Sequence, residues 1–107
     1  MKILPYQLVL QFPADTLKDF DALIALEDLL IAGIEDDETV VDGHDSGSGE
    51  SNIFIHTSDP DLAFTRAHSL LLKQGAPPNG FRAAYRKIDA DSYTVLWPEG
   101  QTEFAVT

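Results

Sequence analysis

The residues best suited to chemistry lie close together in the middle of the chain, in the run Asp42-Gly-His-Asp-Ser-Gly-Ser-Gly-Glu50 and at His56. Carboxylate oxygens and imidazole nitrogens can bind divalent metal ions, and Asp42 and His44, two residues apart, could act as a general acid–base pair. However, the spacing of His44 and His56 is not that of a metal motif, and Asp and Ser side chains can instead hydrogen-bond the amides of a turn. We therefore expect no metal and no cofactor, and we assign no catalytic residue.

The elements that position these residues follow from hydrophobic alternation and from Pro and Gly punctuation. Strands are expected at residues 6–12, 39–44, 52–56, 81–88 and 93–97. One helix is expected from Asp15 or Thr16 to Gly33, where a left-handed glycine would end it. A second is expected from Pro60, capped by Asp59, to Gly75.

This order of elements predicts an α+β fold formed by a single domain over residues 1–107. The arrangement is a ferredoxin-like split βαβ (βαββαβ plus a short terminal strand), with an antiparallel sheet and two helices on one face. A hairpin-rich sheet with helices at one end is the alternative.

A sheet with helices on one face leaves its other face, the open face, to solvent, a partner or a ligand. Burial of Ile53 and Ile55 on the helix side favours a hairpin in which Asn52 pairs with His44. The binding residues expected on the open face are Asp42, His44, Asn52, Phe54, His56, Arg82 and Arg86. Polar groups of this kind can orient a ligand, although the solvated side of an antiparallel sheet is the simpler interpretation.

Charge is distributed unevenly along the 107 residues, whose net charge is −11. Residues 1–61 contain 14 Asp and Glu but only 2 Lys and Arg. Such an excess argues against nucleic acid as a partner, and it would steer a basic protein partner to the surface, although acidic residues also serve solubility. The acidic partner surface is expected to consist of Glu35, Asp36, Asp37, Glu38, Asp45 and Glu50.

The sequence also limits the cellular compartments in which the protein is expected. It contains no Cys and no apolar stretch of about 20 residues, and its N-terminus lacks the pattern of a signal peptide. We therefore expect a cytoplasmic protein that does not bind a membrane.

Three runs, Asp42–Thr57, Arg82–Arg86 and Tyr93–Trp97, resemble a group of small stand-alone bacterial proteins. The resemblance covers most of the chain, but it implies no activity and no site residues, because that group has no activity assigned to it. Small acidic stand-alone bacterial proteins are also typical of the immunity partners of polymorphic toxins, an analogy at the level of class and not of residues.

These observations lead to three functional hypotheses. The first is a non-enzymatic acidic protein-binding module, of which an immunity-type inhibitor of a basic partner is one form. The second is a small-molecule- or metal-handling domain, with or without enzymatic activity, that uses the polar open face. The third is a self-associating subunit, such as a homodimer, that buries the open face against a copy of itself.

Overall fold

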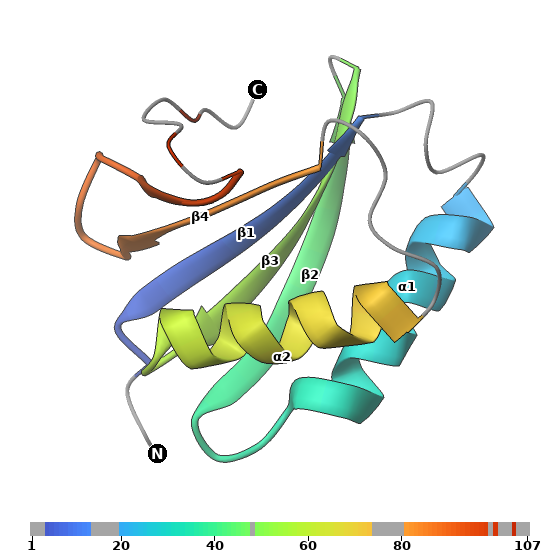
Figure 1. Ribbon diagram of the computed structural model, residues 1–107, viewed down its shortest axis with the longest axis horizontal. Helices are drawn as coiled ribbons and strands as arrows, with labels where there is room; N and C mark the ends of the chain where they lie inside the picture. Colours follow the sequence, from blue (N-terminus) through green and yellow to red (C-terminus); the bar gives the residue numbers. More distant parts are fainter. Residues whose placement is uncertain are drawn as a thin grey trace.

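The computed structural model describes residues 4–13, 20–47, 49–73, 81–98, 100 and 104. Along these residues the elements are β1 (Tyr6–Pro13), α1 (Phe20–Ile34), β2 (Thr39–Gly47), β3 (Glu50–Thr57), α2 (Pro60–Lys73), β4 (Arg82–Lys87) and β5 (Thr94–Trp97) (Figure 1). Neither of the helices within the described residues is long and apolar enough to cross a membrane.

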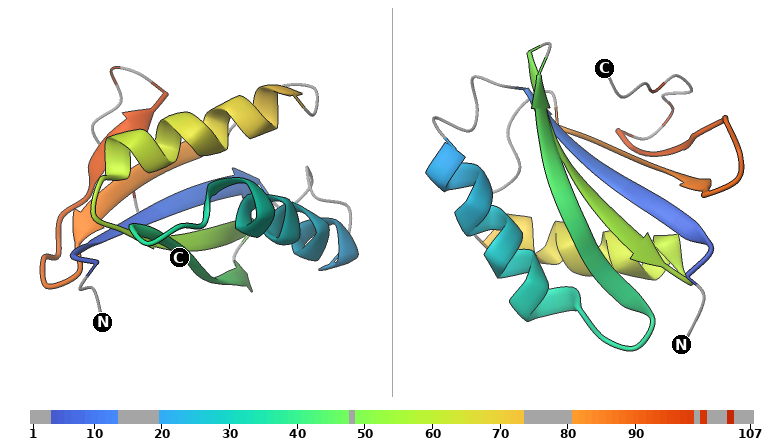
Figure 2. Two further views of the ribbon diagram at one scale, coloured as in Figure 1. Left: turned by 90° about the horizontal axis from the view of Figure 1, so that it is seen from below. Right: turned by 180° about the vertical axis from the view of Figure 1, so that it is seen from behind.

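The strands form one sheet in the order β2-β3-β1-β4-β5, and every neighbouring pair is antiparallel. Both helices lie on the same face of this sheet (Figure 2). The α+β fold class is thus confirmed, and the strand order is compatible with the ferredoxin-like arrangement, extended by β5 at one edge.

Alternation along the central strand β1 defines the hydrophobic core. Leu8, Leu10 and Phe12 point toward the helices and are at most 1% exposed. The buried residues packed with them are Leu30, Ile34, Ile53, Ile55, Ala63, Ala67, Leu71, Phe81 and Ala83. Since full burial of a large aliphatic side chain contributes roughly 1.5–3 kcal/mol, this layer is the main attachment of the helices to the sheet.

The helix ends agree in part with the sequence-based expectation. Asp59 caps α2, because its Oδ1 accepts a hydrogen bond from the Leu62 amide at 3.1 Å. The expected caps at Asp15 or Thr16 and at Gly75 lie outside the described residues.

The expectation for Gly33 is wrong, because α1 continues through Ile34 and Gly33 does not adopt a positive φ. A Cβ at Gly33 would instead lie 2.4 Å from Leu70 Cδ1. This glycine therefore serves the close approach of the two helices, not the end of α1.

An irregularity in β2 changes the direction of its side chains. Val41 faces Ile55 and Gly43 faces Phe54, so that the pairing of β2 with β3 shifts by one residue. Asp42 and Gly43 together oppose Phe54, which is a β-bulge. Gly43 has a φ of 151°, a backbone conformation that residues with a Cβ rarely adopt.

Beyond the bulge, the expected register of the hairpin is wrong by one residue. Asn52 pairs with Asp45, and His44 pairs with Ile53. Because side chains alternate between the two faces of a strand, the extra residue turns His44 to the helix face and Asp45 to the open face.

We expect Gly43→Ala to lower the free energy of unfolding by about 1–3 kcal/mol, because the bulge requires a backbone conformation that alanine strains. Urea denaturation followed by circular dichroism measures the change. Asp45→Ala is the control on the same strand; Asp45 is exposed, so this variant should stay within about 0.5 kcal/mol of the parent. Equal stability of the parent and the Gly43→Ala variant would contradict the importance of the bulge conformation.

Candidate functional site

The middle of the open face carries three rows of residues that run across the strands. His56, Gln7 and Arg86 are cross-strand partners and form the first polar row. Asp45, Asn52, Gln11 and Arg82 are likewise partners and form the second polar row. Between the two lies an apolar row of Gly43, Phe54, Val9 and Ala84.

The expected binding residues therefore do not form one site. Four residues along each strand separate the two polar rows, which corresponds to about 13 Å. Val9 and Ala84 in the apolar row are fully buried, and so is Asn52 in the second polar row. The central part of this face is thus covered, and polar groups of the two rows cannot contact one small ligand together.

In the first polar row, Arg86 holds the β4–β5 turn together. Its Nε donates to Gln7 Oε1 at 3.2 Å, and one terminal nitrogen donates to the carbonyl oxygens of Ile88 at 2.7 Å and of Ala90 at 2.9 Å. The guanidinium carbon also lies 5.9 Å from the centre of the Tyr93 ring. The contacts of Arg86 are those of a structural residue, because its donors are directed at the backbone of the turn.

At the same end of the open face, His56 and Asp42 form an Asp–His pair. The distance from His56 Nε2 to Asp42 Oδ2 is 3.6 Å, and Asp42 belongs to the bulge of β2. Both side chains are partly exposed, at 32% and 57%. A contact this exposed contributes little to stability, although its imidazole is accessible to solvent.

In the second polar row, a buried amide pair joins β1 to β3. Gln11 Nε2 donates to Asn52 Oδ1 at 3.1 Å, and Asn52 is 0% exposed. The Nδ2 atom of Asn52 has no hydrogen-bond acceptor among the described residues. Next to this pair, a pocket of about 200 Å³ is lined by Gln11, Pro13, Gly49, Glu50 and Arg82.

His44, which was expected on the open face, lies on the helix face beside α1. Its Nδ1 is 3.0 Å from Glu27 Oε2, and both side chains are partly buried. The bulge at Gly43 causes this difference, as it reverses the side on which the following residues point. His44 therefore joins β2 to α1 and does not belong to the open face.

The six residues of the expected acidic partner surface lie in two places. Glu35, Asp36, Asp37 and Glu38 lie in the connection from α1 to β2, whereas Asp45 and Glu50 lie near the far end of the β2–β3 hairpin. Along β2 the two places are about 20 Å apart. They do not form a single acidic end of the molecule.

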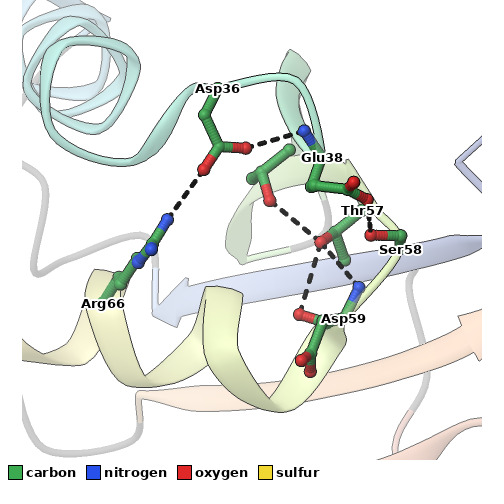
Figure 3. Close-up of polar contacts among 7 residues, drawn as sticks. Asp36, Glu38, Thr57, Ser58, Asp59 and Arg66 are labelled. Atoms are coloured by element: carbon green, nitrogen blue, oxygen red, sulfur yellow. Dashed lines mark hydrogen bonds and ion pairs between the residues drawn. The ribbon is translucent and has the colours of Figure 1, made fainter. Parts of the chain in front are cut away.

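The acidic connection between α1 and β2 is fixed to its neighbours by its own carboxylates (Figure 3). Asp36 accepts hydrogen bonds from the Glu38 amide at 2.7 Å and from Arg66 of α2 at 2.9 Å. Glu38 Oε2 accepts a hydrogen bond from the Ser58 hydroxyl, and Glu35 Oε2 accepts one from the Val41 amide at 2.9 Å.

Two buried threonines, Thr39 and Thr57, connect the start of β2 to the start of α2. The Oγ1 atoms of Thr39 and Thr57 are 3.0 Å apart. Thr57 Oγ1 also accepts from the Asp59 amide at 3.1 Å and donates to the Asp59 carbonyl oxygen at 3.3 Å (Figure 3). The start of β2 is thereby bound to the beginning of α2 through a single hydroxyl group.

We expect Thr57→Val to lower the free energy of unfolding by about 1–3 kcal/mol, because it leaves the Thr39 hydroxyl and the Asp59 amide without this partner. Thr57→Ser is the matched control: it keeps the hydroxyl and loses one methyl group, at a cost of about 1 kcal/mol. Chemical denaturation of both variants measures the difference. A valine variant more stable than the serine variant would show that packing, and not hydrogen bonding by Thr57, stabilises the contact between β2 and α2.

The third histidine, His68 of α2, lies in an aromatic cluster. Its ring centre is 5.2 Å from that of Phe64 and 4.7 Å from that of Trp97. His68 therefore packs against aromatic side chains of α2 and β5. Among the residues that the structure describes, no three His, Asp or Glu side chains lie together in a way that could hold a metal ion.

Sequence reasoning missed two charged contacts that the structure brings together: Glu27 with His44 and Arg66 with Asp36. No local signal could have found either pair, because their members are 17 and 30 residues apart in the sequence. The bulge that produces the first contact does have a signal, namely a glycine within a strand pattern.

The charges of the folded chain are separated in space. Residues 20–47, which we call the acidic flank, comprise α1, its connection to β2, and β2 itself. They contain nine Asp and Glu and no Lys or Arg. Three of the seven Lys and Arg, in contrast, lie in β4, on the other side of the central strand β1.

Comparison of the chain with protein-family models, with curated proteins and with solved structures found no match. The function is therefore argued from the geometry and charge of the described residues alone.

Proposed function

We propose that the chain is a non-enzymatic binding module that captures a basic protein partner on the acidic flank. The observation that carries this proposal is the separation of charge just described. α1 packs against β2, and β2 is an edge strand, so the acidic residues of both elements lie toward the same edge of the sheet (Figure 1). An immunity-type inhibitor of a basic enzyme is one form of this function.

Only some acidic residues of the flank are available to a partner. Glu27, Glu35, Asp36, Glu38 and Asp42 form contacts within the chain. The side chains of Asp28, Asp37 and Asp45, in contrast, are exposed and form no hydrogen bond or ion pair with a described residue. We assign the contact with the partner to these three carboxylates.

The physical basis is long-range attraction followed by short contacts. A surface of one charge sign accelerates the encounter with a partner of opposite sign. Salt weakens this attraction, because the Debye length falls from about 10 Å at 0.1 M to about 3 Å at 1 M. Association should therefore slow as salt rises, while contacts already formed are affected less.

The test uses dodecapeptides of equal length whose charge rises in steps from −4 to +4, titrated into the protein at low and high salt. We expect affinity to increase with positive charge, and the amide NMR signals around Asp28, Asp37 and Asp45 to move most. Asp37→Lys with Asp45→Lys should weaken binding of the most basic peptide about tenfold, since two attractive pairs become repulsive.

The matched control is Asp89→Lys with Asp91→Lys, which changes the net charge by the same amount in the exposed β4–β5 turn. This variant should weaken binding less than about threefold, because the turn is remote from the acidic flank. Equal losses in the two double variants would show that binding follows net charge alone, and they would overturn the proposal.

A further inference from the structure

The pocket next to the second polar row lies where three strands come together on the open face. β1 ends there at Pro13, the hairpin turns at Gly49, and β4 begins at Arg82. Its volume is about 200 Å³. Pockets for drug-sized ligands are larger, so this one suits a small molecule.

The charged groups of the pocket are one acid and one base on opposite sides of β1. Glu50 on β3 is paired with Pro13, and Arg82 on β4 is paired with Gln11. Two strand spacings, or about 10 Å, separate the backbones of β3 and β4. A guanidinium binds a carboxylate through two parallel hydrogen bonds, and a carboxylate binds an ammonium group.

A buried amide is hydrogen-bonded to Gln11, one of the residues that line the pocket. Asn52 is the cross-strand partner of Gln11, which lines the pocket, and it lies two residues from Glu50 on the same face of β3. Its Nδ2 has no acceptor among the described residues, although the side chain is completely buried. A buried donor without an acceptor is rare in folded proteins. Asn52 is not among the residues that line the pocket, so a ligand there would contact this amide pair through Gln11.

We propose that this pocket binds a small zwitterion of the α-amino acid class. Arg82 holds the carboxylate and Glu50 holds the ammonium group, while Gln11 on β1 lines the pocket between the strands that carry them. A ligand with no net charge agrees with the net charge of −11, which disfavours the approach of a simple anion, and Arg82 disfavours a simple cation. This assignment does not depend on the acidic flank.

The test compares three probes that differ by one group: L-serine, 3-hydroxypropanoate, which lacks the ammonium group, and ethanolamine, which lacks the carboxylate. Each is titrated into ¹⁵N-labelled protein, and the side-chain amide signals of Asn52 and Gln11 are followed. We expect saturable movement of both signals with L-serine in the millimolar range, and binding at least tenfold weaker for the other two probes.

Variants at the two charged positions test the assigned roles. Arg82→Gln should weaken L-serine binding at least tenfold. Glu50→Gln should bring the affinities for L-serine and 3-hydroxypropanoate within about threefold of each other. Lys87→Gln is the matched control: it removes a positive charge from the exposed end of the same strand and should leave L-serine binding within twofold.

Three results would overturn the proposal. These are movement of the signals without saturation, equal affinity for the three probes, and an equal loss of binding in the Arg82→Gln and Lys87→Gln variants. The backbone spectrum of each variant shows whether it is folded, so that a loss of binding is not confused with a loss of structure.

Discussion

The central strand β1 is the constraint on which the rest of the structure depends. It is hydrogen-bonded to β3 on one side and to β4 on the other, so its alternation decides which side chains of three strands share a face. On the helix face, β1 contributes Leu8, Leu10 and Phe12 to the core. On the open face, it contributes one amide to each polar row, Gln7 to the first and Gln11 to the second. The composition of the core and that of the open face therefore both follow from the alternation along residues 6–12 of β1.

Much of the fold could be predicted because the sequence signals are local. Asp59 and Pro60 mark the start of α2, and the alternating residues of β1 and β3 mark the side that is buried. The error at His44 arose from a single inserted residue, which a period-two pattern cannot detect without the glycine beside it. One bulge was enough to move an expected site residue to the opposite side of the sheet.

The acidic residues illustrate a different limit of sequence reasoning. A run of four acids suggests a free charged surface, yet Glu35, Asp36 and Glu38 accept hydrogen bonds that position the connection from α1 to β2. The composition shows which residues are acidic, but it does not show which groups their carboxylates bind. The folded contacts were needed to learn which carboxylates, such as Asp37, are available. The partners of the others come from β2, from α2 and from Ser58 in the connection between β3 and α2.

The contacts of Glu35 and Asp36 also bear on how the protein behaves at high concentration. β2 is an edge strand, and exposed edges can pair with the edges of other molecules and start aggregation. The Glu35 carboxylate accepts the hydrogen bond of the Val41 amide. Asp36 forms an isolated β-bridge with Thr39 through their backbones. Two positions of the edge are thus already occupied by the chain itself, and the occupying residues are negatively charged. The first half of β2 therefore has fewer free backbone groups that could pair with a second molecule, and the Glu35 carboxylate there would repel a like-charged copy.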